Sequence, residues 1–119
     1  MLAVEVQNLT HSINNKKILN NINFNLNTDS ISCILGPSGS GKTTLLKLIA
    51  GLGKVQSGKI LINGEEVSST NKHLPTEKRK IGFLFQDYAL FPHLTVKQNL
   101  EYPINYKNSE YKIEDIIDL

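Results

Sequence analysis

The feature that most constrains the fold of this chain is the octapeptide Gly36–Thr43, which reads GPSGSGKT. It matches the pattern G-x-x-x-x-G-K-[ST] at every fixed position. Glycines let a backbone curl tightly and present consecutive N–H groups to an anion, and Lys42 adds a point charge. The pattern is typical of a loop that holds a polyphosphate.

The sequence on either side of this loop supports that interpretation. Residues 31–35 are nearly continuous in apolar character, which predicts a strand buried on both faces of a parallel sheet. Cys33, inside that strand, is expected to be a small buried side chain. Residues 43–50 predict a helix that Gly51 closes. A helix that starts at the loop would direct the positive end of its dipole at bound phosphate.

Within the loop, each chemical group has an expected role. Lys42 would meet the β- and γ-phosphates of a nucleotide, and the Thr43 hydroxyl would ligate a Mg²⁺ ion that bridges them. The residues predicted to hold the phosphates are Gly36, Pro37, Ser38, Gly39, Ser40, Gly41, Lys42, Thr43 and Thr44.

The N-terminal part of the chain alternates between polar and apolar residues, which predicts half-buried strands at 2–8 and 20–27. Residues 14–17 are expected to form the turn between them. A further strand is predicted at 57–62, where Asn63-Gly64 then gives a strong hairpin signal. The two early strands, at 2–8 and 20–27, predict an antiparallel sheet.

The second half of the chain is less regular. Residues 68–79 are polar and predict a loop or a short helix, and residues 81–85 predict another buried strand. A short helix is expected at 94–100, with Pro103 interrupting it. An amphipathic helix is expected to begin at 110–119.

Composition limits the function classes. The chain has 119 residues, one domain or part of one, and its net charge of +2 argues against an electrostatically driven nucleic-acid binder. A single cysteine excludes an intramolecular disulfide framework. The sequence holds no apolar run near the ~20 residues of a membrane helix and no signal-peptide pattern. These features predict a soluble, intracellular chain.

Three segments, 36–52, 57–64 and 81–96, together resemble the nucleotide-binding subunit of an ABC transporter in their order, spacing and wording. The match is closest to bacterial importers for iron(III), polyamines, sulfate or molybdate, and it covers nearly the whole chain. The resemblance implies an α/β fold, an incomplete P-loop NTPase core with an N-terminal antiparallel β subdomain. That core would extend to about residue 95, and 96–119 would start a helical subdomain.

The resemblance also implies roles for single residues. Gln86 matches the Q-loop glutamine, which contacts Mg²⁺ and the attacking water, so Gln86 and Lys42 are the expected catalytic residues and Thr43 and Gln86 the expected metal ligands. Ile13 falls where the family usually has an aromatic residue that stacks on adenine, and it would cover the base by van der Waals contact alone. His11 is an alternative platform. The implied cofactors are ATP and Mg²⁺.

The implied partners are membrane-spanning permease subunits and a second ATPase subunit, with the protein in the cytoplasm, peripheral to the inner face of the cell membrane. Residues 87–95 resemble the segment that meets the coupling helix of the membrane subunits. The expected exposed apolar patch there consists of Tyr88, Leu90, Phe91 and Leu94.

Other elements of the family do not occur in these 119 residues, namely the L-S-G-G-Q signature, the Walker B strand with its acidic residues and the switch histidine. The sequence is therefore expected to be the N-terminal part of such a subunit. Its central sheet would lack the strand beside the phosphate-loop strand, and it would have no base to activate water. Two alternatives stay open: a small-molecule kinase, which would need a lid of arginines where this chain has Arg79 alone, and a non-hydrolysing interaction module.

Overall fold

The computed structural model describes residues 1–88 and 90–107, and the chain divides into two compact units, Met1–Phe83 and Leu84–Leu119. Each unit is described by itself. The helix expected at 110–119 lies outside the described residues.

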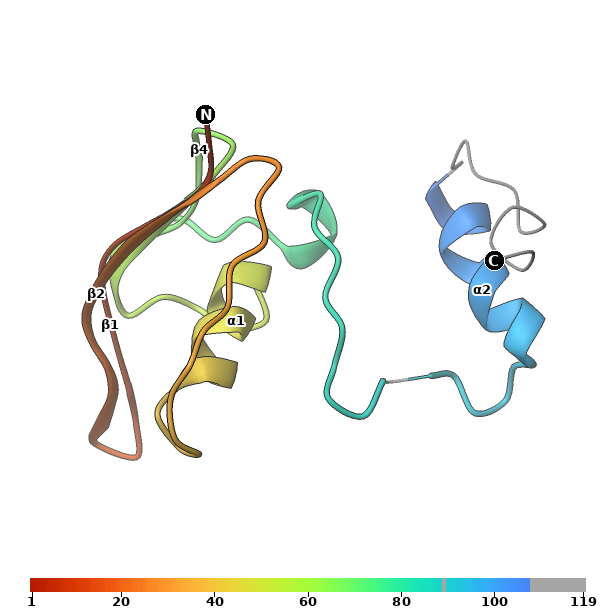
Figure 1. Ribbon diagram of the computed structural model, residues 1–119, viewed down its shortest axis with the longest axis horizontal. Coiled ribbons are helices and arrows are strands. Elements are labelled where there is room, and N and C mark those ends of the chain that lie inside the picture. Colours follow the sequence, from red (N-terminus) through yellow and green to blue (C-terminus); the bar gives the residue numbers. More distant parts are fainter. Residues whose placement is uncertain (89, 108–119) are drawn as a thin grey trace. The chain divides into compact units, whose positions relative to one another are not determined.

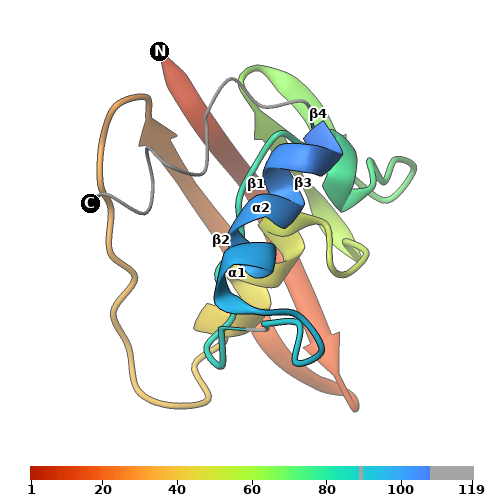
Figure 2. The same ribbon diagram turned by 90° about the vertical axis from the view of Figure 1, so that its right-hand side faces the viewer.

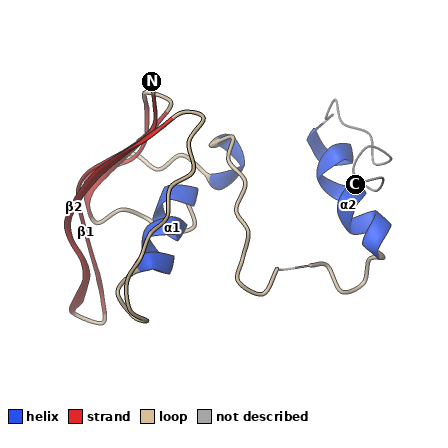
Figure 3. Ribbon diagram, viewed as in Figure 1, coloured by secondary structure: helices blue, strands red, loops and turns tan. Residues whose placement is uncertain are grey.

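The first unit contains a four-stranded antiparallel sheet with the strand order β2-β1-β3-β4 (Figures 1 and 3). The strands are β1 (Leu2–Ile13), β2 (Lys16–Asn27), β3 (Ser57–Ile62) and β4 (Glu65–Ser68). This confirms the predicted antiparallel sheet, although β1 and β2 are longer than the sequence pattern indicated.

Both hairpins of this sheet close through two-residue turns with positive φ. Asn14 and Asn15 have φ values of 51° and 62°, and Asn63 and Gly64 have 50° and 81°. Positive φ at both central residues gives a turn whose twist matches the twist of the flanking strands. Asn and Gly tolerate this conformation best, so local chemistry fixes the hairpin register.

Helix α1 (Lys42–Ala50) covers one face of the sheet (Figure 1) and confirms the helix expected after the loop. Leu45 and Leu48 on α1 pack with strand residues in one core. The buried apolar residues of that core are Val6, Leu9, Leu19, Leu45, Leu48, Val55, Ile60, Ile62 and Val67. Gly51 ends α1 in a left-handed conformation, with the backbone N–H groups of Gly51 and Leu52 donating to the carbonyls of Leu48 and Lys47.

The two buried strands predicted at 31–35 and 81–85 are wrong for this structure: neither segment is a strand (Figure 3). Ile31 is 98% exposed and Leu35 92% exposed, and Cys33 is exposed rather than buried. In Figure 2 the connection from β2 to α1 runs beside the sheet as a loop. A strand needs a neighbour to satisfy its N–H and C=O groups, and among the described residues the sheet contains β1–β4 only.

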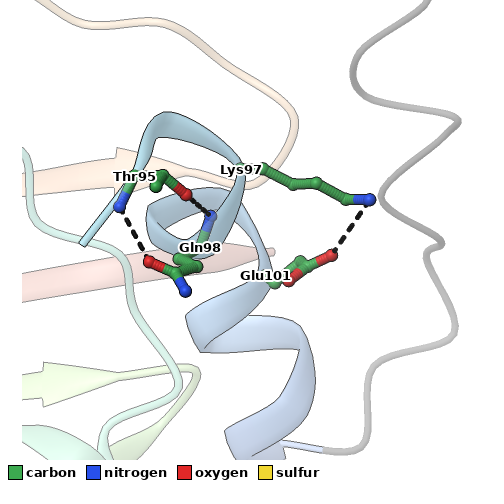
Figure 4. Close-up of polar contacts among 4 residues, drawn as sticks. All are labelled: Thr95, Lys97, Gln98 and Glu101. Atoms are coloured by element: carbon green, nitrogen blue, oxygen red, sulfur yellow. Dashed lines mark hydrogen bonds and ion pairs between the residues drawn. The ribbon is translucent and has the colours of Figure 1, made fainter.

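The second unit contains α2 (Val96–Lys107). The Thr95 hydroxyl accepts from the N–H of Gln98 at 3.2 Å, and the Gln98 side chain accepts from the N–H of Thr95 at 2.9 Å (Figure 4). This reciprocal capping box satisfies two donors that a helix start otherwise leaves unpaired. Exposed Lys97 and half-buried Glu101, one turn apart, form an ion pair at 3.9 Å (Figure 4).

The expected interruption at Pro103 is wrong, because α2 continues to Lys107. Proline removes one backbone donor from a helix, but its own φ is helical, so the helix can run through it at a cost. No helix in the described part of the chain has the length and apolar character of a membrane-spanning helix.

Candidate functional site

The predicted phosphate loop lies directly before α1. The N–H of Ser40 donates to the carbonyl of Pro37 at 3.2 Å, and Gly39 and Gly41 have φ values of 82° and 96°. Gly41 is the N-cap of α1, no side chain caps this helix end, and its first turn carries no acidic residue. The positive end of the α1 helix dipole and the backbone N–H groups of its first turn are therefore left for an anionic ligand.

Gly41 also brings the loop against the β1–β2 hairpin. A Cβ atom at this position would lie 2.9 Å from Ile18 Cγ2 and 2.9 Å from Leu19 Cδ2. Leu19 pairs with His11 on β1, and Ile13 pairs with Lys16 at the end of the same hairpin. Packing at Gly41 thus ties the loop to the hairpin that carries Ile13, whose side chain is 45% exposed.

Lys42 folds its side chain back over the loop. Its Nζ donates to the carbonyl oxygens of Gly36 at 2.5 Å and Pro37 at 2.7 Å, and to Ser40 Oγ at 3.4 Å. These acceptors are neutral, and no ion pair holds Lys42 in the described residues. The ammonium charge is therefore solvated by the loop without being cancelled, which suits exchange onto phosphate oxygens.

A cavity of about 540 Å³ adjoins the loop on the side of β2. Its walls combine side chains of β2, residues 32–35, residues 40–42 of the phosphate loop, and Leu45, Leu46 and Ile49 of α1. Most of this lining is apolar, and only residues 40–42 belong to the loop predicted to hold phosphate. The cavity marks the place where 31–35 fails to pack closely on the sheet and helix.

Sequence reasoning missed Arg79, whose side chain is 2% exposed. Its guanidinium donates hydrogen bonds to the last turn of α1, to β4 and to Leu74. Burial lowers the pKa of Arg79 by desolvating its charge. The one available signal was that Arg79 is the single arginine of the chain, because its acceptors lie up to 31 positions away from it in the sequence.

Gln86 belongs to the second unit and begins a turn, in which the N–H of Tyr88 donates to the carbonyl of Phe85 at 3.0 Å. The Gln86 side chain is exposed. Of the expected apolar patch, Tyr88, Leu90 and Phe91 are exposed, but Leu94 is half-buried.

Asn99 of α2 holds the loop before its own helix. Its Oδ1 accepts from the N–H of Phe91 at 3.0 Å, and its Nδ2 donates to the carbonyls of Phe91, Leu94 and Thr95 at 3.3, 3.2 and 2.8 Å. The Phe91 ring packs against Tyr102 with centroids 4.8 Å apart. Asn99 thus fixes the shape of residues 91–95, which the sequence pattern did not reveal.

The glycine-built loop, the helix that follows it and the antiparallel sheet together define an incomplete P-loop NTPase fold of the α/β class. The sequence profile of the ABC transporter family matches residues 19–119, and the chain belongs to this family.

Known relatives agree with this membership. The chain is 40% identical over 112 residues to the spermidine/putrescine import ATP-binding protein PotA of Pasteurella multocida. This match covers 92% of this chain and 29% of that protein. The chain is also 46% identical over 101 residues to the sulfate/thiosulfate import ATP-binding protein CysA of Neisseria meningitidis. This match covers 85% of this chain and 27% of that protein. The chain therefore spans less than a third of the length of these curated relatives.

Among solved structures, the chain is similar to the ATP-binding cassette MJ0796 in a dimeric post-hydrolysis state bound to ADP and Pi. The TM-score is 0.75 at 33% identity, and the match covers 94% of this chain and 51% of that chain.

Proposed function

We propose that Gly36–Thr43 binds MgATP and that the chain acts within an ATPase subunit that powers solute import across a membrane. The observation that carries the proposal is the glycine-built loop leading into the uncapped N-terminus of α1. The similarity to two import ATP-binding proteins supports it.

Phosphate binding would use groups that the loop already presents. The backbone N–H groups of residues 38–43 would face the β-phosphate, with Thr44 following in the first turn of α1. Lys42 Nζ would exchange its carbonyl acceptors at Gly36 and Pro37 for phosphate oxygens, which carry full charge. Arg79 takes no part in this, because all its donors are used elsewhere.

The residues present fit a Mg²⁺ ion. Thr43 is exposed in the first turn of α1, next to Lys42, and a hydroxyl oxygen is a hard ligand of the kind that Mg²⁺ takes beside phosphates. Gln86, exposed in the second unit, is proposed as a second ligand on its chemistry alone, because an amide oxygen can bind a cation and orient a water molecule. When bound, the ion neutralises charge on the β- and γ-phosphates.

The adenine base would lie against the hairpin end. Ile13 is 45% exposed there and offers an apolar surface without aromatic stacking. His11 is the alternative contact: its Nδ1 is buried without a hydrogen-bond partner among the described residues.

The proposed partners are membrane-spanning permease subunits and a second copy of the ATPase subunit, at the cytoplasmic face of a membrane. Tyr88 and Leu90 are 67% and 69% exposed, and Asn99 holds the loop beside them in shape. Exposed apolar side chains that lie close together in sequence favour a protein partner. The dimeric state of the MJ0796 cassette supports the second copy.

Two lysines of α1 give a matched test. Lys42→Ala removes the charge at the loop, whereas Lys47→Ala removes an exposed charge at the other end of the same helix. Calorimetric titration of the full-length protein with MgATP should show at least roughly tenfold weaker binding for Lys42→Ala and an unchanged affinity for Lys47→Ala. Equal affinities for Lys42→Ala and the unaltered protein would overturn the assignment.

A further inference from the structure

Arg79 is a buried cation held entirely by neutral oxygens. Its five N–H donors match five acceptors: Leu74 O at 2.7 Å, Ser68 Oγ at 2.7 Å, Val67 O at 3.2 Å, Ile49 O at 3.2 Å and Leu48 O at 3.3 Å. No ion pair involves Arg79 in the described part of the chain. A buried charge is tolerated when hydrogen bonds replace its water, and here none of its donors is left over.

These acceptors belong to three separate parts of the first unit. Leu48 and Ile49 lie in the last turn of α1, Val67 and Ser68 end β4, and Leu74 lies in the loop after β4. The last carbonyls of a helix lack partners within the helix, and the negative end of its dipole attracts a cation. Arg79 therefore caps α1 and joins that end to the sheet.

Gly51 leaves room for the Arg79 guanidinium because it has no side chain. A Cβ atom at Gly51 would lie 2.5 Å from Arg79 Nε and 2.8 Å from Cζ, and its φ of 86° also favours glycine. The guanidinium thus fills the space that a side chain after α1 would take. Any larger residue at Gly51 would push on Arg79.

We propose that Arg79 is the positioning residue of the phosphate loop: by fixing the C-terminal end of α1, it sets where Lys42 and Thr43 lie at the other end. The proposal rests on the proposed binding of MgATP by that loop. Arg79 itself touches no ligand.

The length of α1 makes this effect large enough to measure. Nine residues at 1.5 Å each give a rod of about 14 Å, so a tilt of about 4° moves its far end by about 1 Å. A displacement of about 1 Å from a distant mutation can cost roughly a hundredfold in a positioned reaction. Loss of the Arg79 contacts removes the polar restraint on that tilt and leaves the apolar face of α1 alone to resist it.

The first test replaces the guanidinium group of Arg79 and keeps its positive charge. Arg79→Lys retains a cation near the end of α1 but has three donors in place of five. Calorimetry with MgATP on the full-length protein, at a temperature where circular dichroism shows it folded, should give roughly 3–10-fold weaker binding, and Arg79→Met a larger loss. Lys78→Met, an exposed neighbour with the same charge loss as Arg79→Met, should bind as the unaltered protein does.

The second test perturbs the same contact from the other side. Gly51→Ala should weaken MgATP binding when Arg79 is present and add little further loss in the Arg79→Met background, because the clashing guanidinium is gone. Such non-additivity in affinity marks two residues that act through one contact. A purely structural role would lower the midpoint of thermal unfolding in every variant and leave the affinity of the folded protein unchanged.

The outcomes separate the two proposals. Unaltered MgATP affinity in Arg79→Lys and Gly51→Ala proteins, with a lowered unfolding midpoint, would overturn the positioning role. Lack of MgATP binding by the unaltered protein, or full binding by Lys42→Ala, would instead overturn the proposed function. Should Arg79→Met fail to fold, the affinities of Arg79→Lys and Gly51→Ala decide the question.

Discussion

The segments 31–35 and 81–85 are richer in apolar residues than the strands β1–β4, yet in the described part of the chain only β1–β4 form the sheet. Each strand of the sheet has a neighbour that a hairpin or a short connection brings close, and Ile60 at its centre is fully buried. Segment 31–35 has no such neighbour among the described residues, and Ile31 is 98% exposed.

This difference separates two sources of order. Hairpin pairing carries a small loop-closure cost and its register follows from turn chemistry. A parallel strand needs a partner from a distant part of a chain, and its own residues supply only a preference. The phosphate loop stands between both regions: α1 and Gly41 tie it to the sheet, whereas the segment before it is unpaired.

The largest expected effect is a loss of turnover: these 119 residues alone should not hydrolyse ATP. A phosphate-release assay with Mg²⁺ and excess ATP should give the same rate as a Lys42→Ala control, because segment 31–35 leaves one side of the loop unpaired and Gln86 has no basicity to accept a proton from water. Nucleotide binding by this chain should be weak.

Release well above the Lys42→Ala control, and lost in Gln86→Ala, would contradict that expectation. It would show that the loop reaches its working geometry without a neighbouring strand.

The next effect compares one isoleucine from each region. Ile60→Ala should lower the free energy of unfolding by about 2–5 kcal/mol, because it empties a filled core position. Ile31→Ala should change it by no more than about 0.5 kcal/mol, because the side chain is already in water. Urea unfolding of the chain followed by circular dichroism measures both, and equal losses would show that 31–35 packs after all.

The features that could be predicted from the sequence follow the same division. The Asn-rich turns, the strand alternation and the helix closed by Gly51 could be predicted, because each depends on residues close in sequence. The apolar run 31–35 predicted burial that did not occur, since a pattern shows preference without showing a partner. The hydrogen-bond network of Arg79 could not have been predicted, because most of its acceptors are backbone carbonyls, which carry no sequence signature.

A smaller change in the free energy of unfolding is expected from substitutions at two glycines. Gly64→Ala forces a side chain into φ 81° in the β3–β4 turn and should cost about 1–2 kcal/mol, although nothing crowds the new Cβ. Gly82→Ala, also without neighbours within 4 Å and without positive φ, should be neutral or stabilise by up to about 1 kcal/mol. The measurement is the same urea titration; a loss at Gly82 as large as at Gly64 would mean that its segment is more constrained than its exposure indicates.

The smallest effect is at the hairpin end. Ile13→Tyr should tighten ATP binding by about 0.5–1 kcal/mol, because an aromatic ring adds stacking to the contact with the base. Calorimetry on the full-length protein is the measurement, with Ile13→Ala as the comparison that removes the surface. No gain from tyrosine would indicate that another residue, such as His11, already covers the base.

The exposed Cys33 makes segment 31–35 chemically observable. It is the single cysteine of the chain, so a thiol-alkylating reagent would label this segment and nothing else. Any strand that came to lie beside residues 31–35 would shield the sulfur and slow the reaction. The alkylation rate, measured by mass spectrometry on the unmutated protein, would then report when the central sheet is complete.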